Sequence, residues 1–231
     1  MRASILKSIL REHTPALIVG NGINLYGNSG NGNSWEALLQ QLASNHQAPQ
    51  TRVPKGISLT EFYDVLDIAN GNPGSTSSKS APSLQKEFCD LMQSWSAESH
   101  HKLVAQWAKD NNKPILTTNF EDTLGSGIRC TLNHTTTKGF TDYYPWASYY
   151  GHSHINGPSH EFGIWHINGM QHYSRSIRLG LSHYMGSVER ARRWLHKGKE
   201  DRLFSGKNHV HWSPAPTALM RTGFAYRWSN A

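Results

Sequence analysis

The stretch LIVGNGINLYGNSGNG, Leu17 to Gly32, decides the fold. It begins with a short apolar run bounded by Pro15 and Gly20, which is typical of a strand buried in a parallel sheet. Glycines such as Gly20 and Gly22, placed after a strand, let a backbone approach the pyrophosphate of a dinucleotide. Leu25 stands where the dinucleotide pattern has its third glycine, so an ordinary glycine-rich turn explains this stretch alone equally well.

Two later apolar runs also end in polar residues. The run from Pro114 to Thr118 leads to Asn119, whose amide can offer a donor and an acceptor to a ribose, a nicotinamide or a water. Capping of the next turn is the alternative role for that side chain. The run from Phe162 to Ile167 contains His166, which is a candidate general base or else a structural histidine.

Stretches whose apolar residues have the spacing of a helix separate these strands. The chain is therefore expected to form an α/β fold. We expect a Rossmann-like, open and mostly parallel sheet with helices on both faces. A hairpin-like return is expected at 176–181, and the His- and Tyr-rich residues 133–160 show little periodicity. The expected helices are 2–12, Trp35 to Leu42, one after the Ser58–Glu61 capping box, 84–95, 100–109 and 184–196.

Composition narrows the classes of function. The 231 residues include two cysteines, Cys89 and Cys130, which cannot form a four-cysteine zinc module. No run of about 18 apolar residues and no secretory signal is present, so we expect a cytoplasmic protein without a membrane partner. The net charge of +7 suits an anionic partner. A third hypothesis is a basic nucleic-acid-binding protein, which the cluster from Arg190 to Lys207 supports. It ranks last among the function hypotheses because no nucleic-acid motif accompanies the cluster.

The three strand ends, together with KGISLTEFYD (55–64) and SIRLGLSHYMG (176–186), resemble the sirtuin-like domain of bacterial NAD hydrolases in anti-phage defence. The resemblance covers roughly residues 15 to 200. It implies cleavage of NAD to nicotinamide and ADP-ribose without zinc, and it implies that Asn119 and a histidine after the third strand line the nicotinamide–ribose pocket. Self-association or a defence-system partner is also expected. The residues it assigns to NAD binding are Gly20, Asn21, Gly22, Asn24, Thr118, Asn168 and Gly169.

One departure concerns the catalytic histidine. The family often shows His-Ile-His-Gly, whereas here Asn168 precedes Gly169 and His166 is the remaining histidine. Asn119 and His166 are therefore the expected catalytic residues, with His166 as the base. Because an amide cannot accept a proton near neutrality as imidazole does, a module that binds NAD or ADP-ribose without turnover is the alternative.

The second departure is the tail. Residues 1–206 are expected to form the sirtuin-like domain, and 207–231 an irregular tail. Pro214 and Pro216 each remove a ladder donor, so this segment is not expected to form a central strand. The sheet would then lack its last strand, as in a truncated or frame-shifted reading frame, and its open edge would favour self-association.

Overall fold

The structure is a computed structural model that describes residues 16–26, 33–70, 83–135, 137, 140–156 and 161–196, the side chains of 189–196 excepted. Several expectations fall outside these residues and stay predictions. They concern the opening helix at 2–12, the loop at 71–82, the side chains of the basic cluster from Arg190 to Lys207 and the tail at 207–231.

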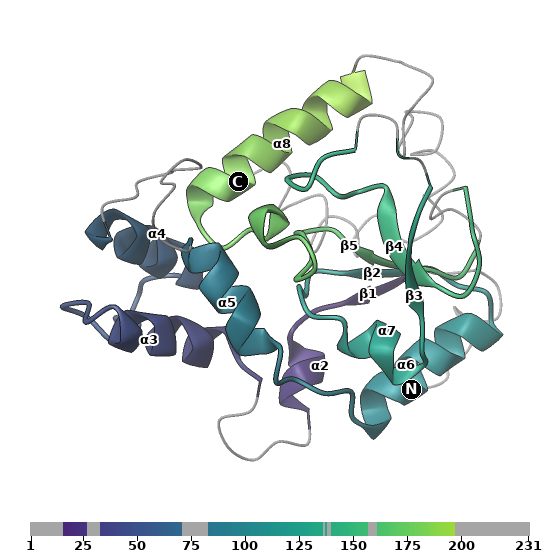
Figure 1. Cartoon of the computed structure of the whole chain (residues 1–231), viewed down its shortest axis with the longest axis horizontal. Coiled ribbons are helices and arrows are strands. Elements are labelled where there is room, and N and C mark those ends of the chain that lie inside the picture. Colours follow the sequence, from purple (N-terminus) through teal and green to yellow (C-terminus); the bar gives the residue numbers. More distant parts are fainter. Residues whose placement is uncertain are drawn as a thin grey trace, which may run out of the picture.

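The protein has an α/β fold with a mixed, open sheet of five strands (Figure 1). Strands β1 (Leu17–Val19), β2 (Ile115–Thr117) and β5 (Ile164–His166) lie side by side and run parallel. All three were predicted from their apolar runs. The sheet continues with β4 (Ser148–Gly151) and β3 (Thr131–His134), which are antiparallel. The prediction missed these two, because neither has an apolar run and their order comes from pairing with β5 and with each other.

The helices mostly follow the sequence signals. Ser34 accepts a hydrogen bond from Ala37 N–H at the start of α3, and Ser58 and Glu61 form the predicted capping box of α4. The hairpin-like return at 176–181 is wrong: the chain forms a 3-10 turn at Ser174–Ser176 and enters α8 at Leu181. The helices are α2 (Gly22–Leu25), α3 (Trp35–Asn45), α4 (Leu59–Ala69), α5 (Leu84–Met92), α6 (Ser99–Asp110), α7 (Thr123–Gly127) and α8 (Leu181–His196).

One face of the sheet packs against α6 and α7. Ile115 and Ile164 lie there with Ala105 and Ala108 of α6 and with Leu124 of α7. On the other face, the buried cluster of the described residues contains strand and loop residues: Leu116, Tyr149, Ile155 and Trp165. Helices were expected on both faces of the sheet, and the described residues show them on one face.

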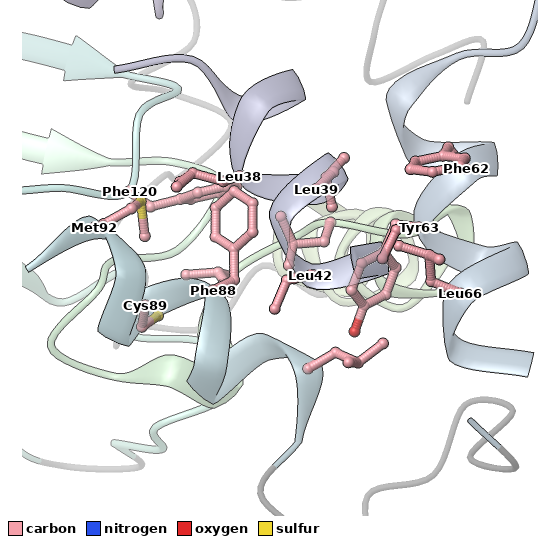
Figure 2. Packing of buried hydrophobic residues seen from close by; sticks show 14 residues of the cluster. Leu38, Leu39, Leu42, Phe62, Tyr63, Leu66, Phe88, Cys89, Met92 and Phe120 are labelled. Atoms are coloured by element: carbon pink, nitrogen blue, oxygen red, sulfur yellow. The ribbon is translucent and has the colours of Figure 1, made fainter. Parts of the chain in front are cut away.

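A second layer, which we call the helical layer, consists of α3, α4 and α5. Its apolar side chains pack around Leu42 and Phe88, both fully buried (Figure 2). Phe120, just after β2, and Ile177, beyond β5, belong to the same cluster. The helical layer therefore covers the region into which these strands run. No helix in the described part of the chain is both long and apolar enough to cross a membrane.

Candidate functional site

The parallel strands bring three distant segments to one edge of the sheet. Thr118 N–H donates to the carbonyl of Val19 at 3.0 Å, which joins the end of β2 to the end of β1. Ile167 N–H donates to the carbonyl of Thr117 at 2.9 Å, which joins the end of β5 to β2. The polar residues that follow each strand therefore meet, as the carboxyl ends of neighbouring parallel strands do. We call this region the strand-end site.

Asn119 lies at the centre of the strand-end site and is fully buried. Its backbone N–H donates to Thr117 Oγ1 at 3.1 Å, and that hydroxyl donates to the carbonyl of Val19 at 2.9 Å. Its side-chain Oδ1 and Nδ2 are buried without a hydrogen-bond partner among the described residues. Thr117 therefore holds the backbone, while the amide is left for a group outside the described chain.

Phe120 anchors this turn in the helical layer. Its ring stacks on Trp35 with a centroid distance of 4.4 Å and meets Phe88 edge-on. Figure 2 shows Phe120 packed near Leu38, Phe88 and Met92. Apolar packing of this ring fixes the backbone on both sides of it, and so fixes Asn119 and Glu121.

His166 contributes the second unpartnered group. Its Nδ1–H donates to the carbonyl of Asn119 at 2.8 Å, so the lone pair lies on Nε2. That Nε2 is buried and has no partner among the described residues. Burial lowers the pKa of His166 to about 4, against the opposing effect of the hydrogen bond to Asn119. The ring is therefore neutral at pH 7, in the form that can accept a proton.

Glu121 is the residue that the sequence analysis missed. Its carboxyl is buried, Oε1 accepts from Asn24 Nδ2 at 2.7 Å, and Oε2 has no partner in the described residues. Burial raises the pKa of Glu121 to about 7, although the hydrogen bond from Asn24 acts in the opposite direction. The Asn119 amide also lowers this pKa, so it lies close by without making a well-aligned hydrogen bond. Its position at the end of TTNFE was the available signal.

Asn24, whose predicted place near the nucleotide stays a prediction, is held by contacts within the protein. It is buried, and Nδ2 donates to Asn21 Oδ1 at 2.8 Å as well as to Glu121. Its Oδ1 is bonded to His101 Nε2 at 2.9 Å. Because these contacts occupy the amide, Asn24 holds the protein together at this edge.

The glycines divide into two kinds. A Cβ added at Gly22 would meet no atom of the described residues within 4 Å, and one at Gly20 would meet only Thr118 Oγ1, at 3.4 Å. Packing in the described chain therefore does not require either glycine, which leaves room for close approach by a ligand. Gly169 has φ +98°, and a Cβ there would lie 2.1 Å from the carbonyl of Ser176. The turn itself requires Gly169.

Asn168 lies beside these residues but is loosely held. Its Nδ2 donates to the carbonyl of Thr118 and to the hydroxyl of Tyr184, both at 3.5 Å. The Arg178 N–H donates to its backbone carbonyl at 3.0 Å. The structure thus places the side chain of Asn168 next to Thr118, on the turn after β5, where the resemblance puts the family histidine.

Two cavities in the described residues lie away from the strand-end site. One of about 110 Å³ lies between α3, α4 and α5, where Leu42, His46 and Leu84 line it. The other cavity has a volume of about 290 Å³. It lies beside the segment that precedes β5 in the sequence, and its lining includes His152 and Phe162. Neither cavity is lined by Asn119, Glu121 or His166, and these three side chains are buried in the described structure.

The chain matches no protein-family model, and no curated protein or solved structure is significantly similar to it. The strand-end site is thus defined by its own geometry. Within the described residues, no group of three or more His, Cys, Asp and Glu side chains is placed to hold a metal ion.

Proposed function

We propose that the protein is an NAD hydrolase that cleaves the nicotinamide–ribose bond and acts at the strand-end site. The observation that carries the proposal is a set of buried polar atoms without a partner among the described residues: Asn119 Oδ1 and Nδ2, Glu121 Oε2 and His166 Nε2. Each such atom costs about 1–3 kcal/mol unless a partner satisfies it. A ligand rich in hydroxyl and amide groups, such as the nicotinamide riboside end of NAD, supplies such partners.

The chemistry follows from the groups present. As the glycosidic bond breaks, nicotinamide leaves with the bonding electron pair and the ribose becomes an oxocarbenium-like cation. Water adds to that carbon and gives ADP-ribose and one proton. The amide of Asn119 orients the ribose and the attacking water. His166 Nε2 accepts a proton from a ribose hydroxyl or from the water.

The low pKa of His166 makes it a weak base at rest. Water that adds to an oxocarbenium-like carbon becomes strongly acidic, so a weak base is sufficient late in the reaction. Gly20, Asn21 and Gly22 are proposed to hold the pyrophosphate, because Gly20 and Gly22 leave space around their backbone. A Rossmann-like mode of NAD binding and a role in anti-phage defence belong to this proposal and rest on the resemblance of the sequence.

A binding module for NAD or ADP-ribose is the second candidate. The position before Gly169 carries Asn168, whose amide cannot serve as a base, and burial lowers the pKa of His166 to about 4, which makes it a weak base. A site of this kind would retain affinity for the nucleotide and lose turnover.

Purified protein incubated with NAD separates the two candidates. Release of nicotinamide and ADP-ribose, followed by chromatography, supports the hydrolase. Binding of ADP-ribose in calorimetry without nicotinamide release supports the binding module. Asn119→Ala, which removes the amide at the centre of the strand-end site, should lower nicotinamide release. Asn45→Ala, a substitution of an exposed residue on α3, is its matched control. Absence of both binding and turnover contradicts the proposal.

A further inference from the structure

A chain of hydrogen bonds connects α6 to Glu121. The backbone N–H of Glu98 donates to His101 Nδ1 at 3.1 Å. Nδ1 is therefore the acceptor nitrogen, and Nε2 carries the proton that it donates to Asn24 Oδ1 at 2.9 Å. With Oδ1 turned toward His101, the Asn24 amide points Nδ2 at Glu121 Oε1. The helix start thus fixes the tautomer of the ring. The ring then orients the amide from its oxygen side, and Asn21 Oδ1, which accepts from Asn24 Nδ2 at 2.8 Å, supports the same orientation.

The members of this chain come from distant parts of the sequence and are buried together. Asn24 lies 77 residues from His101 and 97 from Glu121. The exposed fractions of Asn24 and His101 are each 1%, and that of Glu121 is 3%. Burial and the neighbouring ring of His100 both lower the pKa of His101, which keeps it in the neutral form that the chain requires.

We propose that His101 and Asn24 are positioning residues that hold one oxygen of Glu121, so that the other, Oε2, is presented to bound substrate. The role toward substrate rests on the proposed function, whereas the geometry of the chain does not. A carboxyl buried only for stability would have both oxygens satisfied. Here Oε1 is fixed and Oε2 is unpartnered among the described residues, beside Asn119.

The titration of Glu121 responds to this chain through Asn24, and the Asn119 amide and the backbone N–H groups of Phe120 and Glu121 also lower its pKa. His101 on α6 and His166 on β5 are both kept neutral by burial, which lowers their pKa. Asp122 is next in the sequence, and its carboxylate acts on Tyr150. An N–H from Asn24 favours the ionised carboxyl. A flipped amide would present its oxygen and favour the protonated form.

The first experiment needs no substrate. The protein is labelled with ¹³C at the glutamate carboxyls, and the Glu121 signal is assigned by its loss in Glu121→Gln and titrated. His101→Leu frees the Asn24 amide and should raise the titration midpoint of Glu121 by about one pH unit. His101→Gln, whose amide can still donate to Asn24, should restore the wild-type midpoint. An unchanged midpoint in His101→Leu overturns the proposal.

A second measurement uses the wild-type protein and so does not depend on the folding of a variant. ¹⁵N chemical shifts of the His101 ring should show a neutral imidazole with its proton on Nε2 at pH 7. A charged ring, or a proton on Nδ1, overturns the chain.

The role toward substrate is tested separately. The acid limb of kcat/KM for NAD should move with the Glu121 midpoint in His101→Leu and return in His101→Gln. If the midpoint moves and the acid limb does not, the substrate part of the proposal is wrong. If no variant releases nicotinamide, the proposed function fails, and the titration still decides whether the chain positions Glu121.

Discussion

The helical layer and the strand-end site are both buried, but they are built differently. In the helical layer, apolar side chains fill the interior around Leu42 and Phe88, and serine side chains cap α3, α4 and α5. In the strand-end site, Asn119, Glu121 and His166 are equally buried and keep polar atoms without partners in the described residues. The first arrangement gains stability from burial, and the second loses it. A region that carries such a cost is expected to recover it by binding a ligand.

The largest effect is expected from Asn119→Ala. It removes the amide that orients ribose and water, so nicotinamide release should fall by about a hundred- to a thousandfold or more. The fold should survive, because the Asn119 side chain makes no hydrogen bond with the described residues. Chromatography of the products, with circular dichroism as the check on folding, measures both. Unchanged turnover would remove Asn119 from the mechanism.

Leu42→Ala tests the other region. Leu42 is fully buried on α3, and its truncation leaves a cavity, so the free energy of unfolding should fall by about 2–5 kcal/mol. Ile68→Ala on α4, which removes a largely exposed side chain, is the matched control and should change it by about 0.5 kcal/mol or less. Urea denaturation measures both variants. Equal effects would mean that the helical layer is not the tightly packed region.

Glu121 should make stability depend on pH. Its folded pKa of about 7 lies above the ordinary value of 4.5, so its contribution to stability is present below about pH 4.5 and is lost as the pH rises through 7. Glu121→Gln stays uncharged and should raise the free energy of unfolding at pH 8 by up to about 3 kcal/mol, with little change at pH 4. His166 has a lowered pKa and loses stability as the pH falls from about 6.5 to 4, in both proteins alike. Denaturation curves at the two pH values measure the difference, and a wild-type protein as stable as the variant at pH 8 contradicts it.

The smallest effect is expected at the end of β5 and in the turn that follows it. His166→Ala should reduce nicotinamide release by about a hundredfold, since it removes the proposed base. Asn168→His should raise release, because its imidazole would lie beside Thr118. Initial rates with NAD measure both variants. If neither substitution changes the rate, neither residue is the base.

The sequence predicted the elements that have local signals. The apolar runs predicted β1, β2 and β5, and the serine caps predicted where α3 and α4 begin. Strands β3 and β4 were missed because their composition does not indicate a strand. They form by pairing with each other, for example Asn133 with Tyr149, and a single sequence does not reveal that pairing. The division into residues 1–206 and 207–231 stays a prediction.

The strand-end site shows the same limit. Asn119 could be named because it follows a predicted strand, and His166 because it lies near the end of another. The structure joins them through one hydrogen bond. Glu121 and His101 could not be predicted as site residues. Their shifted pKa values and their contacts come from burial by residues that are distant in the sequence. The hydrogen bond between His101 and Asn24 could not be predicted either, because a glycine-rich stretch does not reveal a distant partner.

One measurement tests the central claim that the unpartnered atoms of the strand-end site form a ligand site. The protein is labelled with ¹⁵N in its asparagine side chains and histidine rings, and its spectrum is followed during titration with ADP-ribose. The account predicts that Asn119 Nδ2 and His166 Nε2 shift together and saturate, while the ring of His46, in the helical layer, stays unchanged. Saturable binding that leaves Asn119 and His166 unmoved, or no binding at all, would contradict it.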